Sequence, residues 1–251
     1  MSEYELVTIL VLMRIILIAL IFITSSCANK SWRDASRESA QIATPAKEQK
    51  ENIFQIYYAR AFSWRGYFGI HPWFAWKKSE DSQYTVAQVT SWNIRRNGSS
   101  ISIQNDIPDR KWYDNEPQIM FEMKGQKARK IIDKVKKQIQ EYPYKDLYRV
   151  WPGPNSNTFV AYIINNVDEL NLELPPHAVG KDFALTNQVI GLSPSKTGFQ
   201  FSLYGILGLE LGLLEGIEVN ILGLNFGLDL YSPALKLPLA GRVGFKDTPW
   251  N

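Results

Sequence analysis

The sequence predicts an α+β fold in which an antiparallel sheet packs on two main helices and a glycine-rich apolar β-hairpin annex follows. Three observations support this prediction. Short aromatic or alternating segments fill the first half of the chain, apolar residues recur with helical spacing at 125–141 and 155–168, and leucines alternate with other residues after position 199. Alternation is typical of half-buried strands, whereas spacings of three and four are typical of amphipathic helices.

Four strands are expected in the first half of the chain, at 53–60, 69–76, 84–93 and 101–103. The first two are rich in aromatic and β-branched residues, which favour strands, and Pro72 places the second at a sheet edge or a strand start. The third alternates, so that one face carries Val86, Gln88, Thr90 and Trp92. Asn97-Gly98 is typical of a two-residue hairpin turn and would connect the third strand to the fourth.

Two helices are expected in the middle of the chain. The first, at 125–141, carries five lysines and one arginine around a single apolar face, which consists of Ala128, Ile131, Ile132, Val135 and Ile139. We expect this face to be buried and the lysines to be solvated. The second helix begins after Asn155, a good N-cap residue, and Pro175-Pro176 ends any continuation of it.

The carboxyl-terminal third of the chain alternates over long apolar segments that contain many glycines. Every second residue from Leu207 to Leu213 is a leucine, and the phase of the alternation shifts at Leu222, which predicts a β-bulge. Two long strands would form a hairpin whose apolar face covers the main domain, a partner or a lipid surface; we expect the main domain. The glycines match neither of the phosphate-binding loop patterns.

The single cysteine, Cys27, follows an apolar run at 15–23 and the small residues Thr24-Ser25-Ser26. With Arg14 before the run, this arrangement resembles a bacterial lipoprotein export signal, which is cleaved before a lipidated cysteine. The alternative is an uncleaved membrane helix from Leu6 to Ser26, although Arg14 in its middle disfavours insertion. Both alternatives predict a membrane-anchored protein of the cell envelope that faces the periplasm or the cell exterior.

These patterns divide the chain into an anchor or signal at 1–27, a flexible tether at 28–50, an α+β domain at 51–190 and the apolar annex at 191–251. Composition limits the function further. One cysteine allows no intrachain disulfide, and two histidines offer few zinc ligands. The net charge of +3 is too small to indicate nucleic-acid binding but suits a position near anionic lipid. We expect no cofactor and no nucleic-acid partner; a carboxylate-only calcium site stays open, and the expected ligand is a cell-wall component or a lipid.

One set of residues could carry chemistry. Ser156 is placed in the first turn of the second helix, where the helix dipole and free backbone N–H groups favour a nucleophile and an oxyanion. His71, on an earlier strand, could accept its proton, and Gln88 on the neighbouring strand could orient the imidazole. His177 is the second choice of base. Ser156 could equally be a helix-capping residue, and His71 a half-buried strand residue.

Three sequence blocks resemble a known family. Trp64-Arg65-Gly66, the block from Tyr148 to Phe159 (with Trp-Pro-Gly-Pro-Asn-Ser-Asn-Thr-Phe at its end) and the block from Leu174 to Asp182 resemble the uncharacterised bacterial domain-of-unknown-function family 3750, over about residues 57–245. This resemblance implies no established activity. More loosely, His-Pro-Trp-Phe-Ala from His71, followed by Asn-Ser-Asn-Thr-Phe, resembles the permuted papain-like fold of NlpC/P60 and lecithin–retinol acyltransferase-like proteins.

The papain-like resemblance implies catalytic roles for Ser156, His71 and Gln88, with Ser156 at the position of a cysteine. A serine hydroxyl ionises far less readily than a thiol and needs its base in contact. Two functions therefore stay open. We favour a non-catalytic envelope lipoprotein that binds or scaffolds, and the alternative is a serine-dependent envelope hydrolase or acyltransferase acting on an amide or ester bond. The candidate ligand-binding residues are Arg65, Trp73 and Asn155.

Overall fold

The structure of the protein is a computed structural model, which describes residues 31–184 and 189–247. The chain divides into two compact units, residues 1–35 and 36–251. In the first unit the described residues form a turn, where the Ser31 carbonyl accepts hydrogen bonds from the backbone N–H groups of Asp34 and Ala35. Cys27 and the expected anchor lie outside the described residues. Among the described residues, no helix has the length and hydropathy of a membrane span.

The second unit has an α+β fold, as predicted, and contains two antiparallel sheets and three α-helices among its described residues. The first sheet has five strands in the order β4-β3-β2-β1-β5. These strands are β1 (Ile53–Arg60), β2 (Ile70–Lys77), β3 (Thr85–Val89), β4 (Ile101–Asn105) and β5 (Gln118–Lys124). The strands predicted at 53–60 and 69–76 are confirmed, and they pair with each other near the middle of the sheet.

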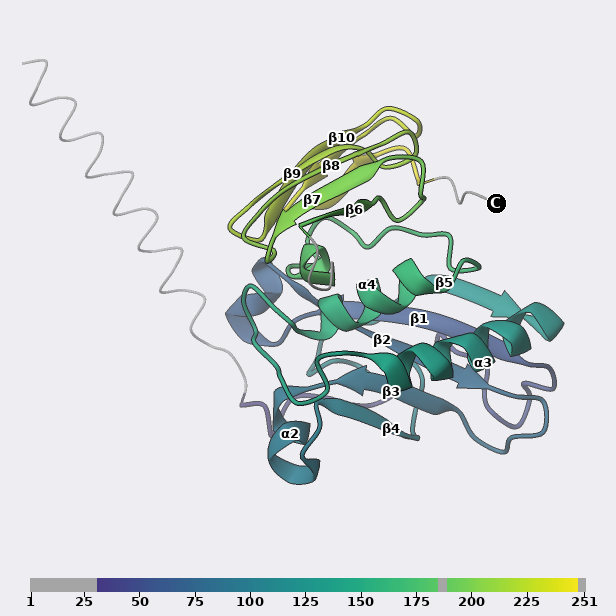
Figure 1. Cartoon of the computed structure of the whole chain (residues 1–251). Coiled ribbons are helices and arrows are strands. Elements are labelled where there is room, and N and C mark those ends of the chain that lie inside the picture. Colours follow the sequence, from purple (N-terminus) through teal and green to yellow (C-terminus); the bar gives the residue numbers. More distant parts are fainter. Residues whose placement is uncertain (1–30, 185–188, 248–251) are drawn as a thin grey trace, which may run out of the picture. The chain divides into compact units, whose positions relative to one another are not determined.

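Two helices cover one face of this sheet (Figure 1). α3 (Gly125–Glu141) has the predicted bounds and buries the five apolar residues predicted to form its inner face. α4 (Ser156–Asn166) begins after the N-cap Asn155, also as predicted. The rings of Phe74 and Phe159 meet edge to face with their centroids 5.7 Å apart, so α4 packs directly on β2.

Successive side chains of β2 point to opposite faces of the sheet. Phe74 belongs to the main core beneath α3 and α4. Trp73 instead belongs to a smaller cluster on the other face, together with Tyr57 and Trp112. His71, which is in phase with Trp73, also faces this smaller cluster and stacks on Trp112. The main core and the smaller aromatic cluster therefore lie on opposite faces of the sheet, and His71 faces the smaller cluster.

The segment after β3 differs from the prediction. Residues expected to end a strand and form a hairpin turn instead form a short helix, α2 (Ser91–Asn97). Gly98 ends this helix at a φ of 72°, and its N–H group donates to the Ile94 carbonyl. A glycine at positive φ serves a helix C-cap as well as a hairpin turn, so the local sequence does not distinguish the two.

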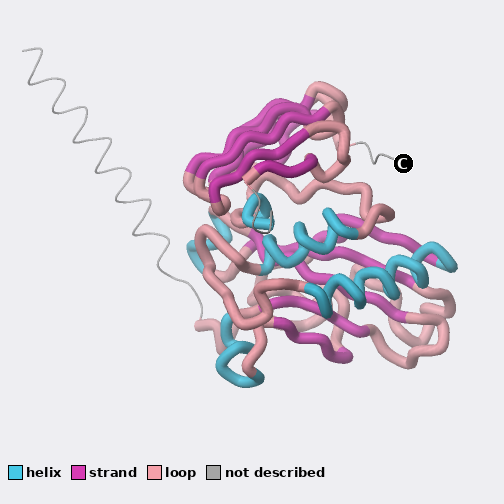
Figure 2. The backbone as a smooth tube through the Cα atoms, in the orientation of Figure 1, coloured by secondary structure: helices cyan, strands magenta, loops and turns pink. Residues whose placement is uncertain are grey.

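The carboxyl-terminal part forms a seven-stranded antiparallel sheet instead of the predicted two-stranded hairpin, and Figure 2 shows the two sheets as separate groups of strands. Its strands pair in sequence order: β6 (Ile190–Leu192), β7 (Phe199–Leu203), β8 (Leu207–Gly212), β9 (Gly216–Ile221), β10 (Leu224–Asp229), β11 (Ala234–Leu237) and β12 (Gly241–Gly244). The phase shift at Leu222 marks a turn and not a bulge, because Leu222 and Gly223, both at positive φ, connect β9 to β10.

The prediction that the apolar face of this segment packs on the main domain is wrong. The buried face of the seven-stranded sheet is polar and includes Gln200, Ser202, Glu210, Glu218, Asn220, Asn225, Asp229 and Lys236. Ion pairs from Glu218 to Lys181 attach this polar face to the segment that follows α4. The apolar side chains point the other way and are largely exposed.

The segment predicted as a flexible tether makes contacts with the domain over its second half. The Asp109 carboxylate accepts hydrogen bonds from the Ser39 hydroxyl and from the backbone N–H groups of Ile42 and Ala43. Farther along, the buried Lys77 ammonium donates to the carbonyl of Gln49 at 2.8 Å. From Ser39 onward, these bonds attach the segment to the five-stranded sheet and its loops.

Candidate functional site

The residues around Ser156 form the amino-terminal cap of α4. The side-chain oxygen of Asn155 accepts hydrogen bonds from the backbone N–H groups of Asn157 and Thr158, and the Thr158 hydroxyl accepts one from the N–H of Asn155. This capping box satisfies N–H groups that a helix end leaves free. Backbone donors that could have stabilised an oxyanion near Ser156 are therefore bonded within the protein.

The same cap joins separate segments of the chain. The side chains of Asn155, Asn157 and Thr158 also donate hydrogen bonds to backbone carbonyls, which belong to Ile70, Val150, Val179 and Gly180. Two of the family-like sequence blocks, 148–159 and 174–182, meet at these bonds. The most specific residues of those blocks thus hold the start of α4, the preceding loop and the segment after α4 together.

Ser156 itself is buried, with 3% of its surface exposed. Its hydroxyl and its backbone both hydrogen-bond to the phenol of Tyr148. Burial raises the pKa of Tyr148, while the bonds with Ser156 and the charge of Arg65 act in the opposite direction. Among the residues that the structure describes, the Ser156 hydroxyl is therefore buried and bonded to the neutral phenol of Tyr148, and neither histidine is its hydrogen-bond partner.

His71 lies in the aromatic cluster on the other face of the sheet. Its Nε2 is 2.9 Å from Oε1 of Gln88, so the expected contact between imidazole and amide is present. Its ring lies flat on Trp112, with centroids 3.6 Å apart and planes 10° apart. Burial lowers the pKa of His71 to about 4, although the bond to Gln88 opposes this shift. The imidazole is therefore neutral at pH 7.

The structure does not bring Ser156 and His71 together. The helix that Ser156 begins packs on the face of the sheet that carries Phe74, whereas His71 projects from the opposite face toward Trp112. Both residues are described, and their hydrogen-bond partners are Tyr148 and Gln88 and not each other. Because serine needs its base in contact, this arrangement forms no Ser–His catalytic pair.

The three predicted ligand-binding residues have different surroundings. Arg65 lies in the 3-10 helix η1 (Ser63–Tyr67), is exposed, and places its guanidinium over the ring of Trp64. Trp73 is buried and donates its indole N–H to a backbone carbonyl. The side chain of Asn155 is hydrogen-bonded within the cap of α4. Arg65 is thus accessible to a ligand, whereas Trp73 and Asn155 have structural partners.

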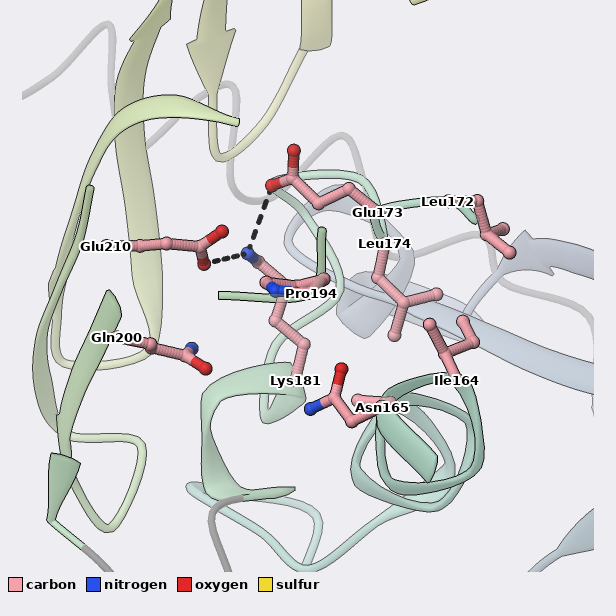
Figure 3. Close-up of a pocket in the computed structure, with 10 residues that line it drawn as sticks. Ile164, Asn165, Leu172, Glu173, Leu174, Lys181, Pro194, Gln200 and Glu210 are labelled. Carbon is pink, nitrogen blue, oxygen red and sulfur yellow. Dashed lines mark hydrogen bonds and ion pairs between the residues drawn. The ribbon is translucent and has the colours of Figure 1, made fainter. Parts of the chain in front are cut away.

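A buried cluster of charges beneath the seven-stranded sheet was missed by the sequence analysis (Figure 3). The ammonium group of Lys181 lies 2.5 Å from Glu218, 3.4 Å from Glu173 and 3.6 Å from Glu210. Lys236 pairs with Glu173 at 2.6 Å. Burial opposes the charge of Lys181, but the surrounding carboxylates hold its pKa well above the ordinary value. The sequence feature that could have indicated this cluster is the placement of Glu210 and Glu218 among the inward residues of strands whose outward residues are apolar.

Three carboxylates of this cluster, from Glu173, Glu210 and Glu218, lie within 4.8 Å of one another, a spacing that could hold a metal ion. The ammonium groups of Lys181 and Lys236 already supply positive charge there. Burial also raises the pKa of Glu210 well above its ordinary value, which reduces the negative charge. The adjoining cavity of about 20 Å³ has room for roughly one water molecule. The cluster is best explained as an ion-pair network that fastens the sheet to the domain.

Comparison with known proteins adds one finding. A family model described as "Protein of unknown function (DUF3750)" matches residues 51–183. The matched segment runs from the start of β1 through α4 and includes both blocks that meet at the α4 cap. No curated protein and no solved structure matches the chain. The resemblance to the permuted papain-like fold therefore stays a prediction.

Proposed function

The chain belongs to the DUF3750 family of proteins of unknown function, and we propose that it is a non-catalytic binding or scaffolding module tethered to a membrane of the cell envelope. The observation that carries this proposal is the bonding of the family-like block around Ser156. Its polar side chains donate to the chain's own backbone carbonyls and leave few groups free for chemistry. Such residues serve the fold, and a site in which Ser156 is buried and separated from His71 suits a module that binds.

The membrane part of the proposal rests on the leader sequence. An apolar run at 15–23, preceded by Arg14 and followed by small residues and Cys27, is typical of lipoprotein export signals. A lipid on Cys27, or the uncleaved helix Leu6–Ser26, would hold the domain at the membrane surface.

The tether is tested by fractionating cells that express the full chain or its Cys27→Ala variant, with Ser26→Ala as the matched control. We expect the full chain and Ser26→Ala in the membrane fraction and Cys27→Ala to be released. Retention of Cys27→Ala would assign the anchor to the uncleaved helix. Recovery of the unaltered chain in the soluble fraction would contradict the tether.

The alternative function, a serine hydrolase or acyltransferase, makes a separate prediction. It requires Ser156 to react with a fluorophosphonate probe and Ser156→Ala to lose that reaction. The proposal of a non-catalytic module predicts equal labelling of the two chains, because the hydroxyl is buried and bonded to Tyr148. Labelling that depends on Ser156 would overturn the non-catalytic part of the proposal and leave the tether unaffected.

A further inference from the structure

The outer face of the seven-stranded sheet is lined by apolar side chains along the described strands β6–β12. Strand register aligns these side chains in rows: Phe201 is opposite Leu209, Leu209 is opposite Val219, and Val219 is opposite Phe226. The intervening residues of each strand point to the buried polar face. Within these strands, no charged or hydrogen-bonding side chain therefore interrupts the apolar rows. We refer to the outward residues of β6–β12 as the apolar face.

The side chains of the apolar face are about half exposed to water. Phe199, Leu207 and Ile221 expose 48, 47 and 51% of their surface. A fully exposed side chain of this size presents on the order of 100 Å², so the rows together expose on the order of 600 Å². This equals the largest apolar patches of ordinary monomers, and such patches mark interaction sites.

The turns that connect the strands extend this surface beyond both ends of the sheet. Tyr204 and Leu222 lie in turns at one end, and Leu213 and Leu230 lie in turns at the other. All four are exposed, Leu213 most of all at 77%. Turns that face water favour glycine, asparagine, aspartate and serine, because these residues bond to water or to their own backbone. Exposed apolar side chains therefore also occur in the turns at both ends of the sheet.

We propose that the apolar face lies on a lipid bilayer, with its side chains among the outer acyl-chain segments. Hydrocarbon is the partner that demands no hydrogen bonds from a surface, and the outward side chains of the described strands offer none. A protein partner would normally form about one hydrogen bond per 100–200 Å² of interface and bury aromatic and arginine anchors. The face instead consists mainly of leucine, isoleucine and valine, the composition that suits acyl chains.

The sheet would rest on the bilayer and not cross it. The outer edges of β6 and β12 carry backbone groups that no further strand pairs in the described chain, and such groups are too costly to place in hydrocarbon. The opposite face is polar and bound to Lys181 and the rest of the charge cluster. The sheet is therefore amphipathic in the sense of an interfacial element, with one apolar face and one polar face.

This inference deepens the proposed function, because it names the surface that the tethered module binds. A tether at the membrane keeps the local concentration of bilayer high, so that even weak attraction by the apolar face keeps the sheet docked. The tether and the docking of the sheet can be tested separately, because the leader and the apolar face are different parts of the sequence.

The test is labelling of the full chain in phosphatidylcholine vesicles with an apolar diazirine that partitions into acyl chains, followed by mass spectrometry of the peptides. We expect peptides from 199–243 to carry label well above peptides from the five-stranded sheet. A double variant, Ile217→Gln with Ile221→Gln, should reduce label on the sheet roughly tenfold. The matched control, Ile103→Gln with Ile119→Gln, alters two isoleucines that are similarly exposed on the other sheet and should leave the label unchanged.

Each outcome decides between the alternatives. Label confined to residues 1–27 would overturn the docking of the sheet and leave the tether standing. Label on 199–243 in an unaltered chain that is recovered in the soluble fraction of cells would support the docking and contradict the tether. A dimer that forms without vesicles, excludes the label from 199–243 and dissociates in the Ile217→Gln, Ile221→Gln variant would assign the face to a second copy and overturn the inference. Unchanged circular dichroism shows that each variant is folded.

Discussion

Glu210 on β8 and Glu218 on β9 are directly opposed in the seven-stranded sheet, and the ammonium group of Lys181 lies within 3.6 Å of both carboxylates. Two carboxyl groups at opposed positions are costly to bury in a sheet, and the Lys181 ammonium supplies the positive charge beside them. Lys181 belongs to the segment matched by the family model, whereas both glutamates lie outside it. This contact therefore connects the family domain to the sheet that carries the apolar face.

Replacing Lys181 with methionine should strongly destabilise the protein. The change leaves buried carboxylates without their nearest counter-charge, and breaking a buried ion pair from one side costs about 3–5 kcal/mol. Urea unfolding of the full chain measures the effect. The control is Lys196→Met, because Lys196 pairs with Asp168 at the exposed surface and such pairs contribute little. Equal stabilities of the two variants would contradict the structural role of the cluster.

Stability should depend on pH through Glu210. Burial raises the pKa of Glu210 well above its ordinary value, so the folded protein holds a proton that the unfolded chain releases. This contribution is complete below the unfolded pKa of about 4.3 and is lost as pH rises toward the folded pKa. Glu210→Gln should therefore reduce the loss of unfolding free energy as pH rises above about 4.3. Glu116→Gln, at an exposed ion pair with Lys111, is the control; identical pH profiles for all three chains would refute the assignment.

The cap of α4 should matter more for stability than Ser156 does. Asn155→Ala removes an N-cap and two N–H groups that donate to the carbonyls of Val150 and Val179, with an expected cost of about 2–4 kcal/mol. Ser156→Ala removes one hydroxyl and should cost about 1 kcal/mol. Asn166→Ala, at the exposed end of the same helix, should be nearly neutral. Thermal and urea unfolding rank the three variants, and a ranking with Ser156→Ala lowest in stability would contradict this account.

Both histidines should stay neutral well below pH 6. Burial lowers the pKa of His71 and of His177 to about 4 each. Because these folded pKa values are depressed, the stability that they contribute is present above the unfolded pKa of about 6.5 and is lost as pH falls toward 4. The loss for His71 approaches about 3 kcal/mol. Nuclear magnetic resonance titration of the two imidazoles, assigned with His177→Gln, tests this directly, and a midpoint near 6.5 for His71 would contradict its burial.

The elements that could be predicted from the sequence are those that local pattern determines. α3 has five apolar residues at helical spacing within a lysine-rich segment, so its bounds and its buried face followed directly. Asn155 is a favourable N-cap residue, and the structure confirms that it caps α4. Gly98 shows the limit of such patterns, because one glycine at positive φ suits a helix end and a hairpin turn equally well.

The orientation of the seven-stranded sheet could not be predicted, for a physical reason. Alternation separates the residues of a strand into two faces but does not say which face is buried. Here the polar face is buried because Lys181, far away in the sequence, compensates Glu210 and Glu218. The predicted contact between Ser156 and His71 is absent for a related reason. His71 points to the sheet face that carries Trp112, and alternation alone does not say which side chains cover that face.

Contact between lipid and the outward residues of β6–β12 can be measured directly. The most direct measurement is the collision rate of a nitroxide at position 219 with oxygen and with a water-soluble nickel chelate, using Val219→Cys in the Cys27→Ala chain on phosphatidylcholine vesicles. We expect collisions with oxygen to dominate at position 219 and collisions with the chelate to dominate for the Ile103→Cys control on the other sheet. Equal access of the chelate to both positions would contradict contact between the apolar face and lipid.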